Sequence, residues 1–312
     1  MTSFSSVYAD PLSAYVALKR AVGFQFERQV AHLQAFDEYL LKKGLRAPLA
    51  QDMVMAFVTD DPSTSMDLRT RRYQAVRGFC EYLASLDPRT PSLDPKALPG
   101  PSGRTVHHIL SDEELGRLLR EARHISNRDP VRGITLHTIV GLAASTGLRI
   151  SEVVRLDRAD VDLATGGLLI RQTKFKKDRY VPTHPSTLET MRSYAALRDS
   201  IFPDCRDAAF FVTMRKRRFV RNTLQQAVCK IARRAGLRGP KGGGISFHSL
   251  RHRFAAKRLI AWYEAGVDVQ AMLPMLATYM GHVHYSDTAY YLTATPELMG
   301  LAAERCQARD QP

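Results

Sequence analysis

The chain has 312 residues, of which 45% are hydrophobic and 24% charged, a balance typical of a globular protein with two domains. It has no run of 18 apolar residues, and its first ten residues lack the pattern of a signal peptide, so neither a membrane span nor a secretion signal is expected. The net charge of +14 and the pI near 9.8 favour a polyanionic partner, with nucleic acid the leading candidate over a merely basic protein.

The cysteines give no sign of a disulfide framework or a zinc site. None belongs to a C-x-x-C pair, and all four are scattered along the chain: Cys80, Cys205, Cys229 and Cys306. This usage suits a reducing compartment. Together with the charge, it predicts a cytoplasmic, nucleoid-associated protein.

Residues 1–86 are predicted to form a small helical domain with a basic side. Apolar residues recur there at helical spacing, as at Leu33, Phe36 and Leu40. A further helix over residues 65–86 repeats apolar residues at the same period. It also carries four arginines: Arg69, Arg71, Arg72 and Arg77.

Residues 87–105 are predicted to form a proline-rich linker. Five prolines fall within residues 87–103, which excludes a helix or a central strand and favours a stiff, extended segment. The boundary between the two domains is therefore placed here.

The second domain, residues 106–312, is predicted to be mainly helical with one β-hairpin. It opens with Ser111 and Glu114, which match a capping box ahead of an apolar run. Strands are expected over residues 168–173 and 179–182, joined by a basic turn. The expected fold class is therefore α+β, mainly α with a small hairpin, and the chain closes with a tail helix.

The segment FHSLRHRFA places three polar side chains on one face of a helix. His248, Arg251 and His252 stand at positions i, i+3 and i+4. Two histidines at i and i+4 can bind a metal, but Ser249 stands where a zinc protease has Glu, and the arginine between them repels a cation. A phosphate suits this face better, and a solvated basic face is the plainer alternative.

The segment TGLRISEVV contains an arginine and a glutamate that can pair. Gly147 allows a tight turn, and Arg149 follows it at the start of a helix. Glu152, three residues later, can orient the Arg149 guanidinium.

In chain order, these motifs are the arginine of TGLRISE, a lysine in a basic hairpin, HSLRH, MGH and then a tyrosine. This order resembles the tyrosine recombinase (phage integrase) family over about residues 106–295. Residues 1–86 match only in character, since they resemble the small helical core-binding domain of that family. The resemblance implies the fold of a tyrosine-recombinase catalytic domain behind a DNA-binding domain.

The resemblance also implies a role for each matching residue. Two arginines hold the scissile phosphate, one histidine handles a proton and another donates to a phosphate oxygen, and a lysine protonates the leaving group. Lys174 matches the lysine position, and Lys177 is the alternative. The catalytic residues implied are Arg149, Lys174, His248, Arg251, His282 and Tyr291, with Glu152 and His252 in support.

Two adjacent tyrosines compete for the role of nucleophile. In the family, the nucleophile lies nine residues after the histidine of the GH pair, and nine residues after His282 stands Tyr291. Tyr290 then lies about 100° round a helix and is expected to be a packing residue.

The implied function is site-specific DNA recombination through a 3′-phosphotyrosyl intermediate, with no metal or other cofactor. The implied partners are double-stranded DNA and, as a homotetramer, further copies of the chain. A type IB topoisomerase and an inactive DNA-binding protein are the alternatives. Residues expected to contact DNA are Arg69, Arg71, Arg72, Lys176, Lys177, Arg215, Lys216, Arg217 and Arg218.

Overall fold

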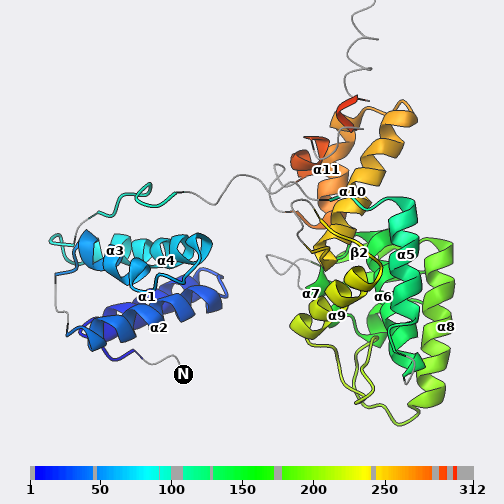
Figure 1. Ribbon diagram of the computed structural model, residues 1–312, viewed down its shortest axis with the longest axis horizontal. Helices are drawn as coiled ribbons and strands as arrows, with labels where there is room; N and C mark the ends of the chain where they lie inside the picture. Colours follow the sequence, from blue (N-terminus) through cyan, green and yellow to red (C-terminus); the bar gives the residue numbers. More distant parts are fainter. Residues whose placement is uncertain are drawn as a thin grey trace, which may run out of the picture. The chain divides into compact units, whose positions relative to one another are not determined.

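The computed structural model describes residues 4–44, 48–90, 92–99, 108–126, 129–171, 178–239, 244–282, 288–293 and 298–300. The chain divides into two compact units, Met1–Thr105 and Val106–Pro312 (Figure 1). Helices dominate, and the described strands form one two-stranded sheet, which confirms the predicted fold class. None of the helices in the described ranges is both long and apolar enough to cross a membrane.

The first unit is a helical bundle built around its fourth helix. That helix packs against the other three, and its apolar stripe, including Tyr73, Val76 and Phe79, is buried. Ser65 caps its start by accepting a hydrogen bond from the Leu68 backbone N–H. The four helices are α1 (Ala9–Ala21), α2 (Glu27–Lys42), α3 (Gln51–Thr59) and α4 (Met66–Ala84).

The segment expected to be an extended linker folds back on the first unit through residue 99. Leu93 is buried in the core of that unit. The Tyr73 hydroxyl donates to the Asp94 carbonyl at 2.7 Å, and the Thr70 hydroxyl donates to the Pro99 carbonyl at 3.3 Å. The prolines exclude a helix here, as expected, but an apolar side chain between them gives the segment a core to join.

The second unit surrounds a buried central helix, α6 (Pro130–Thr146), which packs against α5, α7, α8 and α10 (Figure 1). The predicted capping box at Ser111 and Glu114 is present at the start of α5. The other helices are α5 (Asp112–Arg123), α7 (Ile150–Arg155), η1 (Arg158–Asp160), α8 (Pro185–Ile201), α9 (Arg221–Arg234), α10 (Phe247–Glu264), α11 (Val269–Met280) and η3 (Tyr290–Thr293).

The hairpin is antiparallel, with β1 (Gly167–Ile170) paired to β2 (Arg179–Pro182) in a register that sets Ile170 opposite Arg179. β2 has the predicted bounds. β1 ends at Ile170 rather than at residue 173, since Arg171 already lies outside the strand. The basic turn with Lys174, Lys176 and Lys177 lies outside the described residues.

Two glycines turn the chain toward one place at the ends of α6 and α11. Gly147 and Gly281 both adopt a left-handed conformation, each with a φ of 65°. A Cβ at Gly147 would lie 2.6 Å from the Phe254 ring, so the turn needs both the conformation and the missing side chain. Arg149 lies two residues after Gly147, and His282 directly follows Gly281.

Candidate active site

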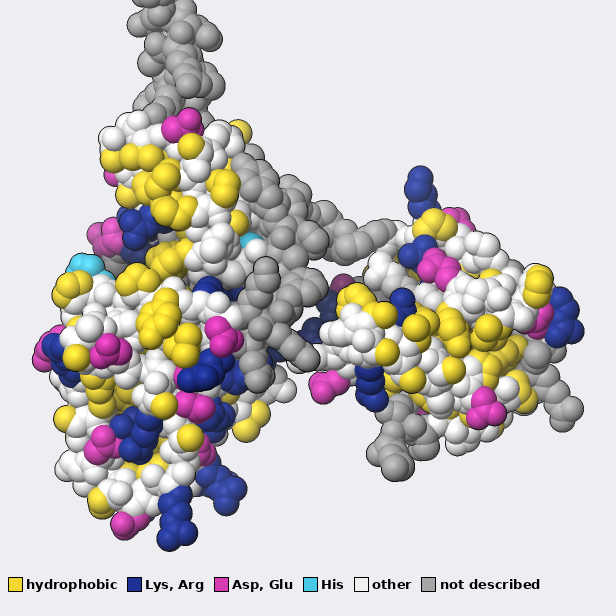
Figure 2. All heavy atoms as spheres, turned by 180° about the vertical axis from the view of Figure 1, so that it is seen from behind, with side chains coloured by type: hydrophobic (Ala, Val, Ile, Leu, Met, Phe, Trp, Pro, Cys, Tyr) yellow, Lys and Arg dark blue, Asp and Glu magenta, His cyan; other side chains and the backbone are white. Residues whose placement is uncertain are grey.

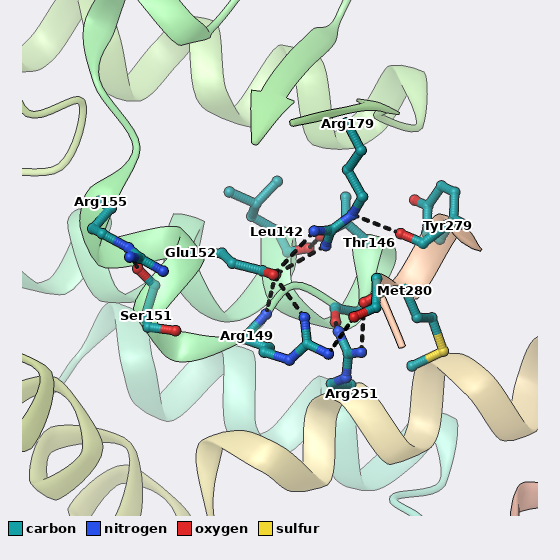
Figure 3. A network of polar contacts seen from close by, with 12 residues as sticks. Leu142, Thr146, Arg149, Ser151, Glu152, Arg155, Arg179, Arg251, Tyr279 and Met280 are labelled. Atoms are coloured by element: carbon teal, nitrogen blue, oxygen red, sulfur yellow. Dashed lines mark hydrogen bonds and ion pairs between the residues drawn. The ribbon is translucent and has the colours of Figure 1, made fainter. Parts of the chain in front are cut away.

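Three arginines from distant parts of the chain gather around one carboxylate (Figure 3). Arg149 precedes α7, Arg179 opens β2, and Arg251 lies in the second turn of α10. Glu152 stands in the first turn of α7 and supplies the carboxylate. We call these four residues the arginine cluster.

The Glu152 carboxylate is buried and accepts four N–H groups. The Arg149 backbone N–H and Nη1 donate to it at 2.8 and 2.9 Å. Arg179 binds both of its oxygens in a fork, at 3.0 Å each. Burial pushes the pKa of Glu152 up, but the hydrogen bonds and charge of Arg179, and then of Arg149, outweigh it and hold the pKa below its usual value. Glu152 is therefore ionised at neutral pH.

The carboxyl end of α11 holds each arginine by one backbone carbonyl. Tyr279 O accepts from Arg179 Nε at 2.8 Å, and Met280 O accepts from Arg251 Nη2 at 2.7 Å. The Gly281 carbonyl accepts from Arg149 Nη2 at 2.7 Å. Carbonyls left unpaired at the end of a helix carry partial negative charge, so three cations suit this place. The helix end thereby fixes the geometry of all three guanidinium groups.

Arg251 is the most deeply buried member of the arginine cluster, with 1% of its surface exposed. Its Nη1 donates to the Gly147 carbonyl at 2.6 Å. Burial, followed by the charge of Arg149, lowers the pKa of Arg251 to about 10, so it stays charged at neutral pH. Three guanidinium groups and one carboxylate leave an excess of positive charge in a water-poor place, which is the setting that binds a phosphate strongly.

Rings of histidine and tyrosine lie beside the arginine cluster. His252 contacts both His248 and Tyr291, with ring centroids 4.4 and 5.4 Å apart. Tyr291 also stacks against His282 at 6.1 Å, and the Tyr291 side chain is buried. Tyr291 lies close enough to Arg251 to act on the pKa of that arginine. The structure thus brings the HSLRH face, the MGH histidine and Tyr291 together.

His282 is set up as a neutral hydrogen-bonding group. Burial, followed by the charges of Arg251 and Arg149, lowers its pKa to about 3, so the free protein holds it neutral. Its Nδ1 lies 2.7 Å from the Thr288 hydroxyl. When Thr288 donates to Nδ1, the proton of the ring resides on Nε2, which can then donate to an anion.

Arg179 was not among the residues predicted from the sequence. The alternation of side chains along β2 could have predicted it, because Arg179 lies on the same face of the strand as Val181, which is fully buried. A cation on the inner face of a strand needs a buried partner, which is Glu152 here. Of the other predicted residues, Lys174 and the Tyr290 side chain lie outside the described part of the chain.

The predicted DNA-contacting arginines differ in how firmly the protein itself holds them. Arg69 donates to the Asp61 and Pro62 carbonyls, and Arg71 pairs with Asp67 at 2.6 Å. Arg218 is bound to Asp157 and to the Val154 carbonyl, whereas its neighbours in the same turn are exposed: Arg215, Lys216 and Arg217. Arg72 lies over the Phe57 ring, 5.5 Å from its centroid.

The excess of positive charge lies in the second unit. Residues 106–312 contain 32 Lys and Arg against 20 Asp and Glu, whereas residues 1–105 contain 13 against 11. On the face drawn in Figure 2, basic side chains of the second unit lie among acidic ones. The basic character expected of the first domain is therefore a local property of α4.

Gly281→Ala is expected to destabilise the second unit and displace two arginines. The added Cβ would lie 2.8 Å from Arg179 Nη1 and 3.3 Å from Arg149 Nη1, in a left-handed conformation that costs about 1–3 kcal/mol. Gly266→Ala is the matched control, since Gly266 has a φ of 70° and open space around it. Urea unfolding, followed by the fluorescence of the single tryptophan, Trp262, measures the free energy of unfolding of the second unit. Equal losses of stability in the two variants would show that the added Cβ at Gly281 does not crowd the arginines.

Comparisons with known proteins identify the family of the chain. A family model described as the phage integrase family matches residues 108–297. The integrase/recombinase-type protein y4rE of Sinorhizobium fredii is 42% identical over 305 residues, which cover 98% of this chain and 97% of the relative. Tyrosine recombinase XerD of Rhizobium meliloti is 31% identical over 298 residues, which cover 93% of this chain and 77% of the relative.

A solved structure shares the fold. It is the XerH site-specific recombinase bound to a palindromic difH substrate in a post-cleavage complex, with a TM-score of 0.66 and 21% identity over 88% of this chain and 78% of that chain. At this identity, the likeness concerns the fold alone. The family model and the two relatives cover most of the sequence, so the chain belongs to the phage integrase family, the tyrosine recombinases, whose activity is site-specific DNA recombination.

Proposed function

We propose that this protein cuts and rejoins DNA through a covalent bond between Tyr291 and a 3′-phosphate. The observation that carries the proposal is a buried tyrosine in ring contact with two histidines, beside a cluster of three arginines in which Arg149 and Arg179 share the carboxylate of Glu152. A phosphodiester under attack gains negative charge on its non-bridging oxygens. Guanidinium groups fixed in advance, with little water around them, stabilise that charge without a metal ion.

Each residue then has a defined task in the reaction. Arg149 and Arg251 bind the non-bridging oxygens, and His282 donates from Nε2 to one of them. His248 takes the proton of Tyr291 as its oxygen attacks phosphorus, and Lys174 protonates the departing 5′-oxygen. The bond from phosphorus to the tyrosine oxygen replaces the bond to the 5′-oxygen, so a free 5′-hydroxyl can later reverse the step without ATP.

The same proposal covers the partners. Residues 1–86 and the second unit each bind double-stranded DNA, and Arg69, Arg71 and Arg72 of α4 are the phosphate contacts of the first. The exposed Arg215, Lys216 and Arg217, and the lysines Lys176 and Lys177, are further phosphate contacts. Exchange between two duplexes needs two cuts in each, so the active assembly is a homotetramer. The palindromic substrate of XerH supports two copies on each site.

Covalent capture of DNA tests this function. Duplexes that the protein selects from a random library are synthesised again with a nick close to the cleavage site. Cleavage then releases a short fragment that carries the 5′-hydroxyl. Because this fragment dissociates, the covalent adduct cannot reverse. We expect an adduct that survives SDS and forms equally well in EDTA, because the arginines replace a metal. No adduct, or one that requires a divalent cation, would overturn the proposal. Relaxation of plasmids that lack the selected site would favour the topoisomerase alternative.

A further inference from the structure

All three side-chain nitrogens of Arg179 donate hydrogen bonds to oxygen atoms of the protein itself. Its Nε donates to the Tyr279 carbonyl, and its Nη1 and Nη2 donate to the two oxygens of Glu152. Its side chain is 12% exposed, against 30% for that of Arg149. Each of its three nitrogens is therefore committed to a protein oxygen, and Arg179 has the less open access to an anion.

Glu152 is the common partner through which Arg179 reaches Arg149. The two arginines bind the same carboxylate, and each also binds a carbonyl at the end of α11. The fork from Arg179 holds the carboxylate by both oxygens and so fixes its plane. A carboxylate with a fixed plane directs the Arg149 Nη1 bond, and hence the direction in which the Arg149 guanidinium faces.

Glu152 and Arg179 also set the net charge around Arg149. Glu152 alone beside Arg149 would neutralise it, and the attraction of that arginine for a phosphate would weaken. With Arg179 on the same carboxylate, the pair of arginines keeps a net positive charge. Arg179 thus lets a carboxylate orient Arg149 without cancelling its charge.

We infer that Arg179 is a positioning residue for phosphate activation, which acts on Arg149 through the shared carboxylate of Glu152. The inference rests on the proposed function, since it concerns the same covalent step. Two other roles are available to Arg179. It could touch the phosphate itself, or it could merely fasten β2 to the end of α11.

A double-mutant cycle on the cleavage rate separates these roles. The variants are Arg179→Gln, Glu152→Gln and the two combined, measured in single turnover on the nicked substrate with protein in excess. Misplacing a catalytic group by about 1 Å costs about 100-fold in rate, so we expect each single variant to lose about 100-fold. Because both act on Arg149, the double variant should lose no more than about tenfold beyond the worse single variant.

Arg179→Lys sharpens the test because it keeps the charge and loses the fork. We expect this variant to cleave at least about tenfold more slowly than wild type while binding DNA with unchanged affinity. Arg192→Lys is the matched control, since Arg192 also donates to two backbone carbonyls, Leu163 O and Ala164 O, on the exposed side of α8. Its cleavage rate should stay within about twofold of wild type.

The outcomes are distinct. If the double variant lost cleavage rate by the product of the two single losses, Arg179 would not act through Glu152. Arg179 would then be assigned to the phosphate itself. Wild-type cleavage by Arg179→Gln would leave only the fastening of β2, and so would a rate loss that disappears once the folded fraction is corrected by Trp262 fluorescence. Wild-type cleavage by Arg179→Lys would overturn the positioning by the fork, because the charge alone would then be enough. Failure of the wild-type chain to form any adduct would instead reject the proposed function.

Discussion

Tyr291→Phe is expected to abolish covalent capture of DNA while leaving DNA affinity within about twofold of wild type. The substitution removes only the phenolic oxygen, which is the proposed nucleophile, so the rate of adduct formation should fall at least about 1,000-fold. The ring remains, and so do its contacts with His252 and His282. The measurement is adduct yield on the nicked substrate in SDS gels, next to a binding titration on the same duplex.

Tyr290→Phe is the matched control for that experiment. It makes the same chemical change one residue earlier in η3, and it should retain wild-type capture. If Tyr290→Phe lost the adduct and Tyr291→Phe kept it, the spacing from His282 would have identified the wrong tyrosine. Digestion of the wild-type adduct and sequencing of the peptide bound to DNA gives an independent answer.

The parts of the site that the sequence predicts are those set by local spacing. Arg149 and Glu152 are three residues apart at a helix start, and the structure pairs them at 2.9 Å. His248, Arg251 and His252 share one helix, so their common face follows from the period of 3.6 residues. The resemblance to a family then supplied the order in which distant motifs meet.

The remaining parts depend on contacts between segments that local spacing cannot relate. The bond from Arg179 to the Tyr279 carbonyl spans 100 residues, and the bond from Arg149 to the Gly281 carbonyl spans 132. No periodicity encodes a backbone carbonyl as a partner, so the role of the α11 end became visible only in three dimensions. The proline-rich segment is a second example. Its composition predicts a stiff chain, but it does not reveal that Leu93 packs into the core of the first unit.

Glu152→Ala is expected to lower the stability of the second unit by about 3–5 kcal/mol, since it breaks a buried ion pair and leaves Arg179 charged with no carboxylate. Urea unfolding read by Trp262 fluorescence measures the loss. Glu189→Ala is the control in the same unit, because Glu189 and Arg192 are both exposed and 3.9 Å apart, and such pairs contribute about 0–1 kcal/mol. Equal losses in the two variants would mean that the arginine cluster is solvated.

The pH dependence of the Glu152→Ala loss has a definite sign. The pKa of Glu152 is lower in the folded protein than in the unfolded chain, so the unfolded chain binds the proton first as the pH falls. The contribution of Glu152 is therefore complete above the unfolded pKa of about 4.3 and is lost as the pH falls through the folded value. The gap in stability between wild type and Glu152→Ala should thus stay constant from about pH 8 to pH 6 and shrink below about pH 4. A gap that grew on acidification would show that the carboxylate is protonated in the folded protein, and the charge balance assigned to Arg149 and Arg179 would then be wrong.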